Sequence, residues 1–248
     1  MNHLALSISD VDLTSALLWL ICWFLTIGLH EGGHAWMAWW KGDDTAFLLG
    51  KRSINPIRHV DKDNYFNLFA TVGLPVLTVF TMGWPIGFAW VPINPGKMRH
   101  PLRDQAFVSL AGPGGNLVGA LAGVLVLALA ILIAAKTGGA LVLHPFQFHA
   151  GETSIALALL AHLAYRMMLI NILLGAINLL PIPGVDGGNV LYYFLSPGGR
   201  EIFNQLRPYG MMIFVLVAWF LLSKPISLLF MFFAVDVTGW LFRALGGT

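Results

Sequence analysis

Long apolar stretches alternate with short polar ones along the whole chain. Residues 13–40, 106–135 and 153–180 are apolar runs, and two shorter runs follow at about 208–222 and 225–243. A helix that crosses a bilayer needs about 20 mostly apolar residues. The pattern therefore predicts an all-α polytopic membrane protein with about five to six transmembrane helices.

The stretch 68–92 is also apolar, but helix-breaking residues interrupt it at Gly73, Pro75, Gly83, Pro85 and Gly87. Irregular backbone is tolerated at membrane depth only where protein buries it or where it lines a water-filled cavity. We therefore expect a broken or re-entrant segment at about 68–92, which dips into the membrane and returns. A single span across the membrane is the alternative.

The composition agrees with a chain that lipid rather than water surrounds. Of the 248 residues, 57% are hydrophobic and 10% are charged, whereas soluble domains carry about 25% charged residues. The formal net charge of +2 is too small to indicate a nucleic-acid partner. We expect one membrane-embedded domain, residues 1–248, with a core over about 13–200 and two additional helices over about 208–243.

Basic residues predict the orientation, because cytoplasmic loops are enriched in Lys and Arg. Five of them lie in loop 41–67 and three in loop 93–105, but only one lies in loop 136–152. If 68–92 is re-entrant, both basic loops share the cytoplasmic side and the N-terminus is outside. The last two helices then return the C-terminus to the cytoplasm. This arrangement predicts a multi-pass protein of the cell (inner) membrane.

The first apolar run contains the polar sequence HEGGH at 30–34. His30 and His34 are spaced i, i+4, which places both imidazoles on one helix face, one turn apart. Two such nitrogens can bind one Zn²⁺ ion, and the adjacent Glu31 is placed as the general base of a metal-dependent hydrolase. A charge at the bilayer centre costs about 2.5–3.5 kcal/mol, so the cluster indicates a function. The motif lies near the cytoplasmic end of its helix, which predicts an active site toward that side.

A catalytic zinc ion has three protein ligands, so the third must come from elsewhere in the chain. Asp186 is a candidate, because the apolar run 153–180 reaches the same side of the membrane just before it. His59 and His100 lie in cytoplasmic segments, and spacing alone leaves them open as ligands. Asn178, eight residues before Asp186, is placed to donate its amide to an oxyanion.

Three sequences occur in order along the chain: HEGGH at 30–34, AGPGGN at 111–116 and NLLPIPGVDG at 178–187. Together they resemble the site-2 protease family, the intramembrane zinc metalloproteases, although that family usually has Leu where this chain has Val185. Segments 42–61 and 90–101 are similar to the small bacterial subgroup without PDZ or CBS domains. The resemblance implies a three-helix catalytic core, a Zn²⁺ cofactor and regulated intramembrane proteolysis. That activity hydrolyses peptide bonds in or near transmembrane segments of membrane protein substrates.

Carried over to this chain, the resemblance implies zinc ligands His30, His34 and Asp186. It also implies that Glu31 is the general base and that Asn178 polarises the scissile carbonyl or holds the oxyanion. The implied partners are a transmembrane or membrane-anchored protein substrate and the lipid bilayer.

Two further asparagines are candidate substrate-binding residues. Asn94 falls in a segment that resembles the strand on which the family docks its unwound substrate, and Asn116 is expected to face the site. For both residues a hydrogen bond at a turn or at a helix start is an equal alternative.

Two other functions remain open. A metal-ion transporter or permease would place polar residues at several depths, whereas this chain concentrates them at one depth. A catalytically inactive relative that binds membrane partners is disfavoured by the intact set of candidate residues. Arg166, in the middle of run 153–180, is either a charge partner on a water path or an arginine paired with backbone carbonyls or Glu152.

Overall fold

The computed structural model describes residues 12–217, 220 and 223–246, and all their regular structure is helical. This confirms the predicted all-α class. Within these described residues, five segments are long and apolar enough to cross a membrane: Leu13–Lys41, Tyr65–Met82, Pro101–Thr137, Ile155–Asn178 and Lys224–Leu245. The helices are α1 Leu13–Lys41, α2 Thr45–Leu48, α3 Tyr65–Leu68, α4 Leu74–Met82, α5 Pro101–Thr137, α6 Ile155–Asn178, α7 Asp186–Phe194, α8 Pro197–Leu206, α9 Gly210–Val217, α10 Ser223–Met231 and α11 Thr238–Leu245.

Short 3₁₀ and π-helical turns connect several of these helices. They are the 3₁₀ turns η2 Pro56–His59, η4 Pro95–Lys97 and η5 Arg207–Tyr209, and the π turns η3 Phe69–Gly73 and η7 Phe232–Val237. The two π turns make α3 continuous with α4 and α10 continuous with α11, so each pair forms one longer apolar helix.

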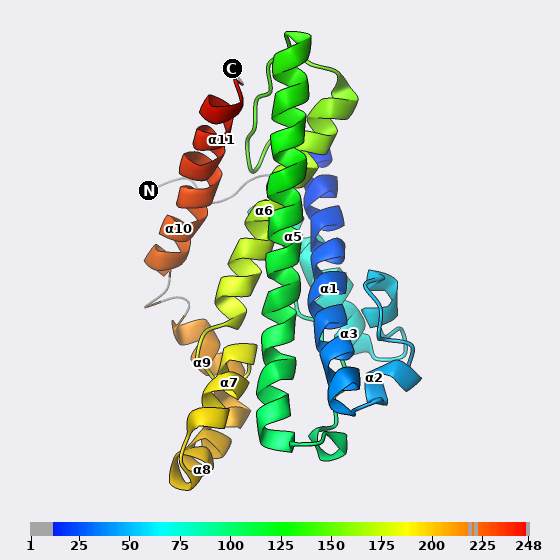
Figure 1. Ribbon diagram of the computed structural model, residues 1–248, viewed down its shortest axis with the longest axis vertical. Helices are drawn as coiled ribbons and strands as arrows, with labels where there is room; N and C mark the ends of the chain where they lie inside the picture. Colours follow the sequence, from blue (N-terminus) through cyan, green and yellow to red (C-terminus); the bar gives the residue numbers. More distant parts are fainter. Residues whose placement is uncertain (1–11, 218–219, 221–222, 247–248) are drawn as a thin grey trace.

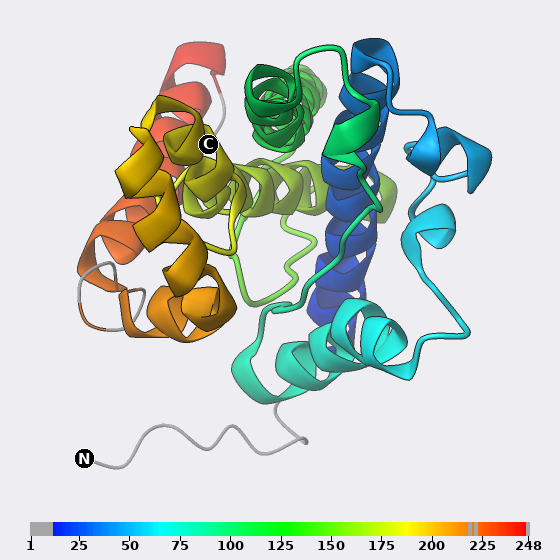
Figure 2. The same ribbon diagram turned by 90° about the horizontal axis from the view of Figure 1, so that it is seen from below.

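Helices α1, α5 and α6 form the centre of the molecule (Figures 1 and 2). Glycines allow close approach of the first two helices, because a Cβ on Gly33 would overlap the Ala111 carbonyl and one on Gly115 would overlap the Leu29 carbonyl. Each glycine costs about 1 kcal/mol of helix propensity relative to alanine. Backbone contact between apolar helices is the usual reason for small residues at such positions. The glycines of both motifs therefore serve one helix–helix interface.

The segment 65–94 enters the bundle beside α1 and turns back. The Trp23 indole N–H donates to the Thr71 carbonyl at 3.0 Å, which ties the segment to α1. Past the turn, the Phe88 N–H donates to the Ala70 carbonyl at 3.0 Å, and the Thr71 hydroxyl donates to the Phe88 carbonyl at 2.9 Å. Residues 70 and 88 are therefore at the same level, with the helical limb running one way and the extended limb the other.

The chain reverses at Gly83, whose φ of +82° favours glycine. The extended limb ends beside the last turn of α1, where the Arg99 N–H donates to the Lys41 carbonyl at 3.1 Å. Both basic loops consequently lie at one end of the bundle, which we call the Lys41 end. The re-entrant prediction for 68–92 is confirmed, and the single-span alternative is wrong.

The C-terminal part departs from the predicted pattern. Of the predicted helix 208–222, residues 218–219 and 221–222 lie outside the described chain, and the described part contains α9 at Gly210–Val217. Helix α9 starts against the loop that precedes α7, since a Cβ on Gly210 would overlap the Pro183 carbonyl. The segment Lys224–Leu245 is long and apolar enough to cross a membrane, and α11 lies at the end where α1 begins (Figure 1). The prediction that the C-terminus shares the side of the basic loops is therefore wrong.

Arg166 is fully buried and lies away from the HEGGH motif, toward the end where α1 begins. Its Nη2 donates to the Ser15 hydroxyl at 2.7 Å and to the Gln147 carbonyl at 3.2 Å, and its Nη1 donates to His162 Nδ1 at 2.8 Å. The guanidinium thus ties the α5–α6 connection to α1 and α6. Of the two interpretations of Arg166, pairing with backbone carbonyls is the one observed, although Glu152 is not its partner.

Candidate metal centre

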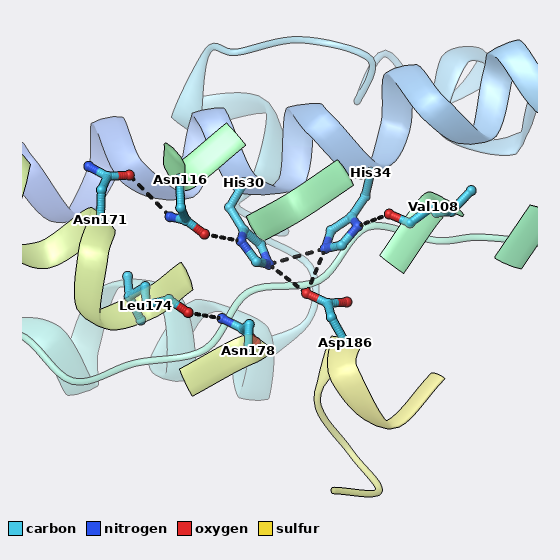
Figure 3. A network of polar contacts seen from close by, with 8 residues as sticks. All are labelled: His30, His34, Val108, Asn116, Asn171, Leu174, Asn178 and Asp186. Atoms are coloured by element: carbon cyan, nitrogen blue, oxygen red, sulfur yellow. Dashed lines mark hydrogen bonds and ion pairs between the residues drawn. The ribbon is translucent and has the colours of Figure 1, made fainter. Parts of the chain in front are cut away.

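Three ligand atoms from two distant parts of the chain converge near the Lys41 end (Figure 3). Helix α1 places His30 and His34 one turn apart, and α7 begins at Asp186. The two imidazole Nε2 atoms are 3.1 Å apart, and Asp186 Oδ2 lies 3.2 Å from His30 Nε2 and 3.3 Å from His34 Nε2. His34 is seven residues before Lys41, so the centre lies about 10 Å along the helix from that end.

The opposite ring nitrogens of both imidazoles lie against oxygen atoms. His30 Nδ1 lies 2.6 Å from Asn116 Oδ1, and His34 Nδ1 lies 2.7 Å from the Val108 carbonyl. Both oxygens are acceptors, so each Nδ1 is placed to donate, and each Nε2 faces Asp186, where an unprotonated nitrogen can offer its lone pair. Asp186 Oδ2 is buried and has no hydrogen-bond donor. When both rings are neutral with the proton on Nδ1, three acceptor atoms face one another, and a bound cation satisfies all three.

Zinc fits this arrangement. A tetrahedral ion with ligands at about 2.0–2.1 Å needs ligand atoms about 3.3–3.4 Å apart, and the three observed separations are 3.1–3.3 Å. Within the described residues, His30, His34 and Asp186 form the one group of three His, Cys, Asp or Glu side chains with such close ligand atoms. Two imidazoles and a carboxylate suit zinc, and a fourth position is left for water or substrate.

The other two histidines that spacing left open do not join this group. His59 is fully buried, and its Nε2 donates to the Ser53 carbonyl at 2.7 Å. Burial lowers the pKa of His59 below its ordinary value. His100 precedes the first turn of α5, where its backbone N–H donates to Asp104 Oδ2 at 2.8 Å. The structure thus selects Asp186 as the third side chain beside the two motif histidines.

A tight turn after α6 brings Asp186 to this position. Gly184 has a φ of +100°, a conformation that strongly favours glycine. A Cβ on Gly187 would overlap the Leu179 and Leu180 carbonyls, and one on Gly188 would overlap the Ile182 carbonyl. The glycines on both sides of Asp186 therefore let the chain fold back on itself and start α7 against the end of α6.

A buried chain of amides continues from His30 through all three central helices (Figure 3). Asn116 Nδ2 donates to Asn171 Oδ1 at 3.1 Å, and Asn171 Nδ2 donates to the Thr26 hydroxyl at 3.0 Å and to the Met167 carbonyl at 2.9 Å. Asn116, Asn171 and Thr26 are each at most 1% exposed. These contacts fix the orientation of the His30 ring. The sequence analysis assigned no role to Asn171 or Thr26, although each is a polar residue inside a predicted apolar run.

Glu31 and Asn178 line the space in front of the metal centre. A cavity of about 210 Å³ is lined by both residues together with His30, His34 and Asp186. A second cavity of about 90 Å³ extends from it along α1, sharing His30, Glu31 and Asn178. One amide hydrogen of Asn178 is donated to the Leu174 carbonyl at 3.0 Å, which leaves the second for another acceptor.

Asn94 and Asn116 take the structural alternative that the sequence left open. Asn94 Oδ1 accepts the Gly96 N–H at 3.0 Å in a turn, and the Asn94 N–H donates to Asp43 Oδ2 at 2.6 Å. Asn94 is not among the residues that line the two cavities, whereas its neighbours Val91 and Ile93 line the larger one. Asn116 contacts His30 itself rather than the open space.

Comparisons with known proteins agree with this geometry. The sequence model of peptidase family M50 matches residues 18–221. "Putative zinc metalloprotease YwhC" of Bacillus subtilis is 29% identical over 201 residues, which are 80% of this chain and 78% of that protein. "Putative zinc metalloprotease Rip2" of Mycobacterium tuberculosis is 32% identical over 220 residues, 89% of this chain and 68% of that protein.

A third relative, "Putative zinc metalloprotease Rip2" of Mycolicibacterium smegmatis, is 29% identical over 195 residues. That match covers 79% of this chain and 64% of the relative. No solved structure matches the chain. The family match over most of the chain, together with a centre suited to zinc, shows that this protein belongs to peptidase family M50, the site-2 protease family of zinc metalloproteases.

Proposed function

We propose that this protein is a zinc endopeptidase that cleaves transmembrane or membrane-anchored protein substrates in or near their membrane-spanning segments. The observation that carries the proposal is the centre of three acceptors, His30 Nε2, His34 Nε2 and Asp186 Oδ2, which opens on a cavity also lined by Glu31. The proposal treats residues 1–248 as a single membrane-embedded domain.

His30, His34 and Asp186 would hold the zinc ion. When bound, zinc acts as a Lewis acid that polarises a peptide carbonyl and makes water a nucleophile near neutral pH. Glu31 follows His30 on the helix, so its carboxylate is rotated off the ligand face yet reaches the same cavity. Glu31 accepts a proton from the attacking water and returns it to the leaving amine. The second amide hydrogen of Asn178 stabilises the negative charge that develops on the carbonyl oxygen.

A helical substrate must unwind before its peptide bonds become accessible, because the helix occupies its carbonyl groups. Residues 89–93 of the re-entrant limb are extended and make no backbone–backbone hydrogen bond with the described chain. Ala89, Trp90, Val91 and Ile93 line the metal-centre cavity. Their free N–H and C=O groups are suited to hold an unwound substrate by strand addition, which supports a binding role for this limb rather than for the Asn94 side chain.

The proposed orientation places the metal centre toward the cytoplasm in the cell (inner) membrane. The support is that the centre lies near the Lys41 end, and both Lys- and Arg-rich loops lie at that end. Cytoplasmic loops are the ones enriched in these residues. Water and protons would then reach Glu31 from the cytoplasmic side.

The test compares wild-type protein with Glu31→Gln, which has nearly the same shape but cannot accept the proton. Both proteins are purified in detergent, zinc is counted by mass spectrometry, and cleavage of co-expressed membrane proteins is followed in the native host. We expect Glu31→Gln to keep its zinc and to lose cleavage, with intact membrane substrates accumulating on it. A metal transporter would instead lose transport and metal affinity in parallel. Zinc retention with undiminished cleavage would contradict the assigned role of Glu31.

A further inference from the structure

A further cavity, larger than the two described above, adjoins the metal-centre cavity at the Lys41 end. It has a volume of about 560 Å³ and lies between the start of α5, helix α7 and the turn η5. Ile93, Gln105 and Asn189 line both cavities, so the two spaces adjoin along a shared wall. Ligand sites typically occupy about 300–1,000 Å³, and this space is within that range.

One face of helix α7 runs from the metal-centre cavity to the larger cavity. Asn189 is three residues after Asp186, so both side chains lie on the same helix face, about one turn apart. Tyr192, three residues further, lines the larger cavity. A polypeptide held at the metal centre and extended along this face would pass Asn189 and reach Tyr192. Helices α7 and α8 lie at the Lys41 end (Figure 1), so this stretch of polypeptide leaves the membrane-embedded part of the protein.

The lining of the cavity is suited to a peptide backbone. Gln105 Oε1 is shielded from solvent and has no hydrogen-bond partner. An unpaired buried polar atom is unfavourable, and a peptide N–H in the adjoining space would satisfy it. Asn204 Nδ2 donates to the Tyr192 hydroxyl at 3.1 Å, so the opposite wall also presents oriented polar groups.

The cavity carries a positive charge that no acidic lining residue balances. Arg207 is the one charged residue in its lining, and its guanidinium forms no ion pair within the described part of the chain. The guanidinium carbon lies 5.3 Å from the ring centre of Tyr192 and 5.7 Å from that of Phe203. These rings position the cation at the wall without neutralising it.

We propose that this cavity is an accessory substrate site, which binds the extended polypeptide just beyond the cleaved segment and in which Arg207 selects an acidic side chain. The identity of the occupant as substrate rests on the proposed protease function. The expected ligand is an extended peptide with an aspartate or glutamate opposite Arg207. That expectation follows from the residues that line the cavity.

Direct binding tests this without relying on hydrolysis. The probes are two fluorescein-labelled octapeptides that share an Ala-Leu-Ala-Leu half and differ in a serine-rich half with two Asp or two Lys residues. Anisotropy is measured on zinc-loaded Glu31→Gln protein in nanodiscs of zwitterionic lipid, which adds no lipid charge. We expect the Asp peptide to bind about two- to fivefold more tightly, the range of an exposed ion pair.

Charge reversal separates a local site from general attraction. Arg207→Glu should reverse the preference, and Arg207→Gln should abolish it. The matched control is Arg99→Glu, because Arg99 is exposed at the same end of the bundle but does not line the cavity; it should keep the preference for Asp. Equal effects of Arg99→Glu and Arg207→Glu, or an unchanged preference in Arg207→Glu, would overturn the proposal. A failure of wild-type protein to cleave any peptide would overturn the protease function alone, since the binding preference is measured separately.

Discussion

The hydrogen bond between Asn116 and His30 makes the role of the buried amides measurable. Asn116→Ala removes the oxygen that lies 2.6 Å from His30 Nδ1 and leaves that N–H unpaired among groups with little access to water. An unpaired buried donor costs about 1–3 kcal/mol. Loss of such a partner typically lowers metal affinity about 10- to 100-fold. The two estimates agree, because a factor of ten corresponds to about 1.4 kcal/mol.

Competition with a chromophoric zinc chelator in detergent measures this affinity. We expect Asn116→Ala to bind zinc about 10- to 100-fold more weakly than wild type. Asn116→Asp keeps an acceptor of the same size against His30 but loses the donor to Asn171, so it should bind zinc more tightly than Asn116→Ala. Asn171→Ala, one step further along the chain of amides, should have a smaller effect. Equal zinc affinities of Asn116→Ala and wild type, with both proteins folded by circular dichroism, would refute the reasoning.

Three further changes test the packing, the buried arginine and the pH dependence. Gly33→Ala should destabilise the protein by about 1–3 kcal/mol, because the new Cβ overlaps the Ala111 carbonyl. Gly114→Ala should be neutral or stabilise by up to about 1 kcal/mol, since nothing lies within 4 Å of its Cβ. Equal unfolding midpoints of the two variants in mixed micelles would contradict this. Arg166→Met should lower the free energy of unfolding by about 2–4 kcal/mol, because the hydrogen bonds of the guanidinium are lost. An unchanged unfolding midpoint would count against a role of Arg166 in holding the α5–α6 connection. Burial lowers the pKa of His59 below its ordinary 6.5, so its contribution to stability is complete above that pH and falls as pH drops from about 6.5 toward the folded-state pKa. His59→Gln should flatten this part of the stability–pH curve, and a curve identical to that of wild type would argue against it.

The membrane-spanning pattern and the motif residues could be predicted because their signals are local. Uninterrupted apolar runs correspond to α1, α5 and α6, and the breakers at 68–92 correspond to the re-entrant segment. The spacing of His30 and His34 determines their common face by helix geometry alone. Asp186 required more than spacing, because the turn with positive φ at Gly184 decides where α7 starts.

Other features depend on tertiary contacts that no local pattern contains. The run 208–222 is apolar enough to suggest a span, yet α9 packs on the Pro183–Gly184 turn, and the C-terminus ends on the side opposite to the predicted one. Asn171 looks like an isolated polar residue until α5 places Asn116 against it. Arg166 likewise gains its partners only when the α5–α6 connection folds back onto it.

The central claim is that His30, His34 and Asp186 together hold one zinc ion. X-ray absorption spectroscopy on purified protein, combined with metal counting, tests it most directly. The account predicts about one zinc per chain, with nitrogen and oxygen ligands at about 2.0–2.1 Å that include two imidazoles, and loss of the metal in His34→Ala and Asp186→Ala. A protein that holds no zinc after mild extraction, or one whose zinc is unchanged by Asp186→Ala, would contradict it.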